Sequence, residues 1–184
     1  MTNQLLRHHI FETIFGFAAI VFREDNSSVK RILLPLNSKT TSEKLLTETL
    51  SSSPGHTPKI LKLSSDIQAY FNGTPISLSM ESIDLSELSD LEQLVLKKVT
   101  TVKYGQTQTY GQISEQIGRP RAYRFVGTTL AKNPFPLTIP CHRIVRSDGS
   151  PGGFAGGTTM KKRMLAMEKQ NCELRSGECH ETTE

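Results

Sequence analysis

The sequence changes its charge and its hydrophobic pattern at the same place, near residue 85, and this break constrains the fold most. Residues 1–96 contain eight Lys and Arg against eleven Asp and Glu, whereas residues 97–146 contain nine basic residues and a single acid. A linker rich in Ser, Asp and Glu separates the two regions, from Glu81 to Asp90. We therefore predict two domains, over residues 1–85 and 86–170.

The basic segment indicates a polyanionic partner. Residues 97–146 combine a net charge of +8 with almost no compensating acid, and such a concentration of positive charge attracts nucleic acid. A solvated basic face has the same composition, so charge alone leaves both interpretations open.

The N-terminal region has the pattern of a mixed α/β domain. Two apolar runs, Thr13–Phe22 and Val29–Leu36, predict strands, and the polar EDNSS between them predicts a hairpin turn. Helices are predicted over Thr41–Leu50 and, from an N-cap at Ser65, up to Phe71. A further strand is indicated by the alternation of Ile76, Leu78 and Met80. The histidines have no cysteine near them in the sequence, so we expect at the surface His8, His9 and His56.

Two capping boxes predict where helices begin in the second region. Ser89 with Glu92 precedes a helix with an apolar face, and Thr109 with Gln112 precedes a short helix that ends near Ile117.

Another short helix is predicted from about Arg121 to Lys132, between the turn Gly118-Arg119-Pro120 and the pair Asn133-Pro134, which ends it. Two short helices around a Gly-containing turn in a basic segment predict a helix-turn-helix that binds DNA.

Cys141 is the residue best suited to carry chemistry. Apolar residues flank it on both sides, so an inert buried thiol is one interpretation. His142 is its neighbour, Arg143 and Arg146 favour a thiolate, and Pro140 restricts the backbone. We expect an extended segment here, in which His142 reaches the sulfur only through a bend or a water.

The sequence after Cys141 contains a glycine-rich loop and a last helix. Residues 149–157 read GSPGGFAGG, whose glycines allow close approach of backbone to a ligand, and Phe154 offers a stacking face. The last helix is predicted over Thr158–Lys169. Glu168 falls near its end, where an acid opposes the helix dipole, so we expect this acid to have another purpose.

The stretch from Tyr104 to Glu168 resembles the alkyl-accepting domain of the O6-alkylguanine-DNA alkyltransferases, or methylated-DNA–protein-cysteine methyltransferases. The family signature appears here as Ile139-Pro140-Cys141-His142-Arg143-Ile144-Val145, at a fitting distance from Tyr110, Arg124, Asn133 and Glu168. The fold that the resemblance implies is α+β, with a ribonuclease-H-like α/β domain over 1–85. A mostly helical domain over 86–170 would contain the helix-turn-helix and the active-site cysteine.

The resemblance implies a catalytic set of four residues. Cys141 is the nucleophile and the acceptor, and His142 takes its proton through a water. Glu168 orients His142, and Tyr110 donates a hydrogen bond to the base as it leaves.

The resemblance also implies DNA contacts and a base pocket. Arg124 would enter the base stack in place of the extruded nucleotide, beside further contacts from Tyr123, Phe125, Thr128 and Arg143. The flipped base would be framed by Asn133, Ile144, Phe154, Ala155 and Gly156. Two of these positions depart from the small residues usual in the family, namely Tyr123 and Phe125.

The implied function is repair of double-stranded DNA by irreversible, stoichiometric transfer of an alkyl group, methyl above all, from O6 of guanine to Cys141. O4 of thymine is a further candidate position. We expect no metal or cofactor, since displacement at a saturated carbon needs only a soft thiolate and a proton for the leaving base. We also expect a monomer. The alternatives are an alkyltransferase-like protein that binds alkylated bases without reacting, a helix-turn-helix regulator and a cysteine hydrolase.

Other features bear on the compartment. The longest apolar run, Ile14–Phe22, is half the length of a membrane span, and the N-terminus lacks the pattern of a secretory leader. Three cysteines suit a reducing interior, so we expect an intracellular protein, cytoplasmic in a prokaryote or nuclear in a eukaryote. We expect residues 171–184 to form a disordered tail rather than a metal site built on Cys172, Cys179 and His180.

Overall fold

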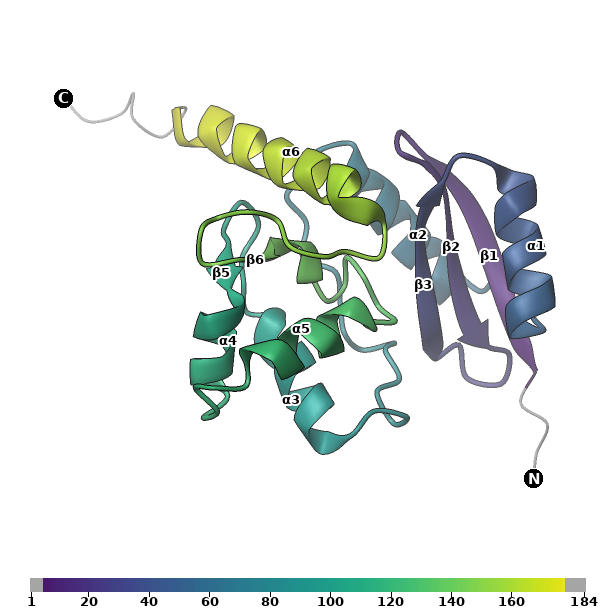
Figure 1. The fold of residues 1–184 in the computed structure, drawn as a ribbon. Helices are drawn as coiled ribbons and strands as arrows, with labels where there is room; N and C mark the ends of the chain where they lie inside the picture. Colours follow the sequence, from purple (N-terminus) through teal and green to yellow (C-terminus); the bar gives the residue numbers. More distant parts are fainter. Residues whose placement is uncertain (1–4, 178–184) are drawn as a thin grey trace. The chain divides into compact units, whose positions relative to one another are not determined.

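The computed structural model describes residues 5–177, and its contacts divide them into two compact units (Figure 1). The first unit contains the chain up to Asn72, together with Leu78–Leu88 and Pro134–Thr138. The second contains Gly73–Ser77, Ser89–Asn133 and the chain from Ile139 onward. The fold is mixed α/β, as predicted. No helix within residues 5–177 is both long and apolar enough to cross a membrane.

The first unit is built on a four-stranded sheet in the order β3-β2-β1-β4. Antiparallel pairing joins β1 (Leu6–Thr13) to β2 (Gly16–Arg23) and β2 to β3 (Val29–Leu36), whereas the two-residue β4 (Ser53–Pro54) runs parallel to β1. The predicted hairpin between β2 and β3 is confirmed.

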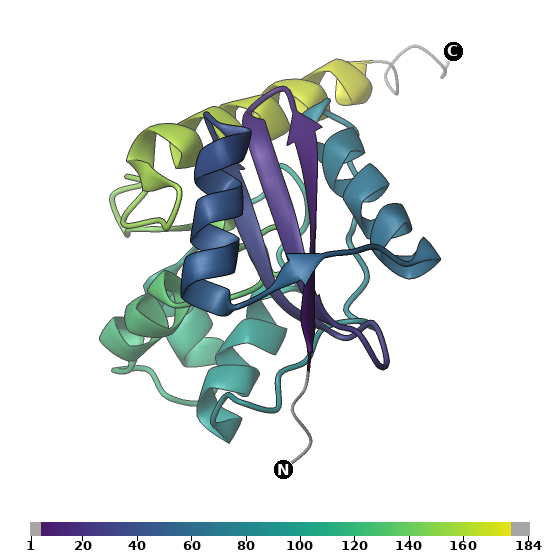
Figure 2. The ribbon, with the colours of Figure 1, turned by 90° about the vertical axis from the view of Figure 1, so that its right-hand side faces the viewer.

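Strand β2 is buried on both faces of the sheet, which explains its unbroken apolar sequence. Ala19 and Val21 pack with Leu46 of α1 (Lys39–Leu50) on one face. Their neighbours Ala18 and Ile20 point to the opposite face by alternation and are equally inaccessible. Figure 2 shows α1 covering one face of the sheet, with its axis running roughly along the strands.

Helix α2 (Pro58–Phe71) begins seven residues before the predicted N-cap at Ser65, so that prediction was wrong. Thr57 accepts a hydrogen bond from the backbone N–H of Ile60, and Pro58 occupies the first helical turn, where it needs no N–H partner. Ser65 is an exposed residue inside the helix.

Two further predictions for the first unit need correction. No strand forms over Ile76–Met80, and β1 was missed because His, Arg and Glu interrupt its apolar alternation. His8, which we expected at the surface, is buried, and its Nδ1 lies 3.0 Å from the Ser52 hydroxyl. This hydroxyl partner compensates the polar ring for its loss of water.

The second unit contains α3 (Asp90–Val99), α4 (Tyr110–Gln116), α5 (Tyr123–Ala131) and α6 (Gly157–Gly177). Both predicted capping boxes are present, at the starts of α3 and α4. Short strands β5 (Gln108–Thr109) and β6 (Ile144–Val145) pair in parallel.

The last helix is longer than predicted. Because α6 continues to Gly177, residues 171–177 do not belong to a disordered tail, and Glu168 lies well inside the helix rather than at its end. The helix-dipole explanation for Glu168 is therefore wrong. Cys179 and His180 lie outside the described residues.

Candidate active site

Cys141 begins a single 3-10 turn, η1 (Cys141–Arg143), and not the extended segment that we predicted. Hydrogen bonds from the Arg143 N–H to the Pro140 carbonyl and from the Ile144 N–H to the Cys141 carbonyl close this turn. Cys141 is 5% exposed, and its burial raises the pKa of the thiol. Groups that stabilise the thiolate are therefore needed for reactivity at neutral pH.

Asn133 supplies one of these groups. Its side-chain amide donates to the Cys141 Sγ at 3.2 Å and to the Ile139 carbonyl at 3.0 Å. Hydrogen bonds to the charged form of an acid lower its pKa. The resemblance placed Asn133 at the base pocket, and the structure brings it directly to the sulfur.

His142 and Glu168 form a buried pair beside the cysteine. The imidazole Nε2 lies 2.8 Å from the Glu168 Oε1. Burial works to raise the pKa of Glu168, but the hydrogen bonds and charges of His142 and Arg143 outweigh it and lower that pKa to about 2. Burial lowers the pKa of His142 despite the pull of Glu168, which leaves a neutral ring able to accept a proton.

Arg143 has a structural position rather than the DNA-binding one that we predicted. Its side chain is 7% exposed, and its guanidinium forms a forked pair with both Glu168 oxygens at 3.0–3.2 Å. A further N–H donates to the Val102 carbonyl at 2.8 Å. Because its guanidinium is buried and bonded to these partners, Arg143 is not available to contact a DNA phosphate. The prediction that Arg143 contacts DNA is therefore corrected.

Lys161 is a functional candidate that sequence reasoning missed. Only 1% of this lysine is exposed, and its Nζ donates to the Ile144 carbonyl at 2.5 Å. The Nζ also lies 5.8 Å from the ring centre of Tyr110. Burial lowers the pKa of Lys161 to about 8, although the nearby Cys141 acts to raise it. Within the basic run Lys161-Lys162-Arg163, only the burial distinguishes this lysine.

Tyr110 is at the start of α4, beside small residues that leave room for its ring. A Cβ added to Gly127 of α5 would lie 3.9 Å from the ring, and one added to Gly152 would lie 2.7 Å from the Tyr110 hydroxyl. Burial raises the pKa of this hydroxyl, so Tyr110 keeps its proton at neutral pH and can donate it in a hydrogen bond.

The other predicted residues are divided between α5 and the glycine-rich loop. Tyr123, Arg124 and Thr128 are exposed on α5, and Phe125 is half-buried. In the loop, the rings of Phe154 and His142 meet edge to face at 6.4 Å, which brings Phe154 to the catalytic pair. No described contact of Ala155 or Gly156 reaches that pair.

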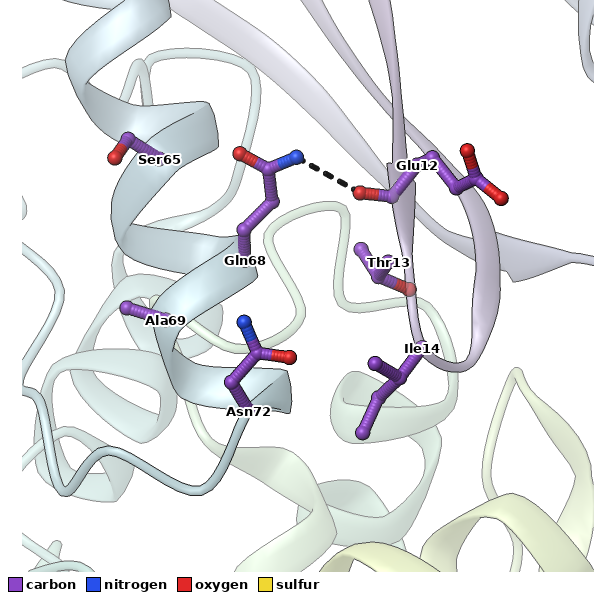
Figure 3. Close-up of a pocket in the computed structure, with 7 residues that line it drawn as sticks. All are labelled: Glu12, Thr13, Ile14, Ser65, Gln68, Ala69 and Asn72. Atoms are coloured by element: carbon purple, nitrogen blue, oxygen red, sulfur yellow. Dashed lines mark hydrogen bonds between the residues drawn. The ribbon is translucent and has the colours of Figure 1, made fainter.

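The first unit contains a hollow away from Cys141 and the residues around it. It has a volume of about 650 Å³ and is formed by the end of β1, the residues after it and α2. Figure 3 shows its lining residues, among which the Gln68 amide donates to the Glu12 carbonyl at 2.9 Å. None of the predicted site residues lines it, so the chemistry is not there.

Comparison with known proteins agrees with the site in the second unit. A family model described as the DNA-binding domain of 6-O-methylguanine DNA methyltransferase matches residues 90–170. The methylated-DNA–protein-cysteine methyltransferase of Methanosarcina barkeri is 41% identical over 108 residues, 57% of this chain and 65% of that protein. The protein of the same name from Methanosarcina mazei is 32% identical over 111 residues, 60% of this chain and 68% of that protein.

Solved structures extend the similarity beyond the aligned region. The crystal structure of Mycobacterium tuberculosis OGT in complex with DNA has a TM-score of 0.72 at 28% identity, over 90% of this chain and 94% of that one. The sequence match to the Methanosarcina barkeri relative spans less than two thirds of its length, whereas the structural match covers nearly the whole molecule.

Proposed function

The chain belongs to the 6-O-methylguanine DNA methyltransferase family, and from this premise we propose that it repairs DNA by moving an alkyl group from O6 of guanine to Cys141. The observation that carries the proposal is the buried array around that sulfur. Asn133 donates to Sγ, Lys161 adds a positive charge, and the His142–Glu168 pair accepts the thiol proton.

The reaction is a displacement at the alkyl carbon. The thiol proton passes through a water to His142, whose positive charge Glu168 then stabilises. The thiolate forms the S–C bond while the C–O6 bond breaks, and the electron pair leaves with guanine. Tyr110 donates a hydrogen bond to the departing base, which takes up one proton, and the His142 imidazolium gives a proton back through water, so that the ring returns to its neutral form. The thioether is stable, so each molecule acts once.

DNA binding would use α4 and α5 as a helix-turn-helix within an alkyl-accepting domain over residues 86–170. The target atom is stacked inside the duplex, so the nucleotide must be extruded before it can react. Arg124 is exposed on α5 and would fill the gap from the minor groove, with Phe125 and Thr128 beside it. Phe154, Ala155 and Gly156 would frame the flipped base.

Two smaller proposals complete the assignment. The antiparallel β1–β3 ribbon with a parallel β4 supports a ribonuclease-H-like domain over residues 1–85. The protein would act as an intracellular monomer on O6-alkylguanine in duplex DNA, with O4-alkylthymine as a further candidate substrate.

The proposal is tested by the mass of the intact protein after mixing with duplex DNA that contains O6-methylguanine. We expect a gain of one methyl group per protein, mapped to Cys141 by peptide analysis. Cys141→Ser should gain nothing. Cys172→Ser is the matched control, because Cys172 is a second thiol outside the array, and it should react as the wild type does. Tight binding of the lesion without any gain in mass would contradict alkyl transfer.

A further inference from the structure

A pocket of about 260 Å³ lies over Tyr110 in the second unit. Two aromatic residues, Tyr110 of α4 and Tyr123 of α5, line it, and Arg146 adds a cation. The rest of the lining consists of small residues of α5 and of the glycine-rich loop, such as Gly127 and Gly152. A volume slightly below the roughly 300–1,000 Å³ of drug-sized ligand sites suits a single nucleobase.

Tyr123 is not part of the hydrophobic core. It is 49% exposed, although it is one of the largest side chains of α5. Packing inside the protein therefore does not explain why a large aromatic side chain occupies this position. The Arg124 guanidinium lies 6.0 Å from its ring centre, so the same side chain lines the pocket and neighbours the arginine to which we assign base extrusion.

Arg146 is held at the pocket by the turn that follows β6. Its N–H donates to the Ser150 carbonyl at 2.9 Å, and its own carbonyl accepts from the Gly149 N–H at 2.9 Å. These bonds fix the backbone while the side chain stays exposed. The charge of Arg146 also acts on Tyr110, where it opposes the rise in pKa that burial causes.

An aromatic wall and a cation on one small pocket match the two parts of a nucleotide. The flat face of an aromatic ring stacks on any base, and an arginine pairs with phosphate. A contact along a DNA groove would need neither a pocket nor a second aromatic side chain in its lining.

We infer that Tyr123 is a specificity-determining residue that stacks on the base held over Tyr110, and that Arg146 binds the phosphate of the same nucleotide. The inference rests on the proposed function and deepens it. The pocket then takes a nucleotide within a strand in preference to a free base. Tyr123 acts inside the pocket rather than along the groove.

The test measures alkyl transfer from two probes, free O6-methylguanine and a single-stranded oligonucleotide that contains it. A single strand removes the extrusion step, so Arg124 does not enter the comparison. Tyr123→Ala should react about tenfold more slowly with both probes, because a base–aromatic stack is worth about 1–3 kcal/mol. Tyr123→Phe, which keeps the ring, should react as the wild type does. Arg146→Gln should slow alkyl transfer from the oligonucleotide but not from the free base. It should also weaken the dependence of the oligonucleotide reaction on salt concentration.

Leu94→Ala is the control, because Leu94 is an exposed apolar side chain of α3 away from the pocket, and it should change neither rate. Wild-type reaction of Tyr123→Ala with the free base would overturn the stacking, and equal slowing of both probes by Arg146→Gln would overturn the phosphate contact. Binding of the oligonucleotide is also measured for Cys141→Ser, with and without Tyr123→Ala. This measurement does not depend on alkyl transfer, because the variant lacks the acceptor sulfur. A protein that fails to transfer but loses affinity about tenfold on Tyr123→Ala would contradict the proposed function and leave the pocket assignment supported.

Discussion

The Nε2 of His142 lies 2.8 Å from the Oε1 of Glu168, and neither side chain is more than 1% exposed. A carboxylate buried to this degree is stable only with several donors. Glu168 has them, since Arg143 donates to both of its oxygens and the Gly105 N–H donates to Oε2 at 3.0 Å. Glu168 therefore keeps its negative charge beside the His142 imidazole, and this charge favours the ring's acceptance of the thiol proton from Cys141.

Replacing this charge tests its role. Glu168→Gln keeps the shape but leaves the buried Arg143 without its counter-charge, so we expect a loss of about 3–5 kcal/mol in the free energy of unfolding. The imidazolium also loses its stabilisation, and the pKa of the Cys141 thiol should rise. Urea unfolding and a thiol titration measure the two effects. An unchanged thiol titration would remove Glu168 from the mechanism even if stability falls.

The pH dependence of stability follows from the same residue. The pKa of Glu168 is lowered from 4.5 to about 2 on folding, so the unfolded chain binds the proton more tightly. The stability that the ionised carboxylate contributes is complete above about pH 4.5 and is lost as the pH falls toward 2. Unfolding measured from pH 6 down to 2 should show this loss, and Glu168→Gln should show a smaller one. Parallel curves for the two proteins would contradict the assignment.

Lys161 is predicted to support the thiolate. Its positive charge acts to lower the pKa of the Cys141 thiol against the effect of burial, so Lys161→Met should raise that pKa further and leave less thiolate at neutral pH. The rate of alkyl transfer near pH 7 should fall severalfold and recover at higher pH. Lys162→Met is the matched control, because Lys162 is exposed. Equal rates for the two variants would show that the buried charge has no part in the reaction.

The sequence predicted the second unit better than the first. Capping boxes at α3 and α4 depend on residues three apart, which local reasoning can read. Strand β1 was missed because His, Arg and Glu interrupt its apolar alternation, and the burial of His8 depends on a partner 44 residues away in the chain. Lys161 was missed for the same reason, since a run of three basic residues is typical of a solvated face and only the tertiary structure buries one of them.

The geometry around Cys141 was also beyond local reasoning. A 3-10 turn of three residues has no periodicity to detect, so an extended segment was the natural prediction. Glu168 was identified through the resemblance, whereas the helix-dipole argument for it failed because α6 continues for nine residues past it. Its actual partner Arg143 had been assigned to DNA, since charge alone does not tell a buried pair from a phosphate contact.

Gly152 is predicted to be required for the position of Tyr110. Its φ of +61° is unfavourable for any residue with a side chain, and an added Cβ would lie 2.7 Å from the Tyr110 hydroxyl. Gly152→Ala should displace the tyrosine or the loop and slow alkyl transfer by about tenfold or more. Gly149→Ala is the control, because Gly149 has a φ of +79° and nothing within 4 Å of its added Cβ. Similar losses in both variants would attribute the effect to backbone strain alone.

Arg124 is predicted to matter only where a base must leave a duplex. Its side chain is exposed on α5, and a planar cation can stack in the gap that an extruded nucleotide leaves. Arg124→Ala should slow repair of O6-methylguanine in duplex DNA by more than tenfold, while the rate with free O6-benzylguanine stays near that of the wild type. Lys132→Ala removes an exposed charge that lies just past the end of the same helix. It should cost only a modest, salt-dependent part of the affinity for DNA. Equal slowing of the duplex and free-base reactions by Arg124→Ala would contradict the extrusion role, because the free base has no stack to leave.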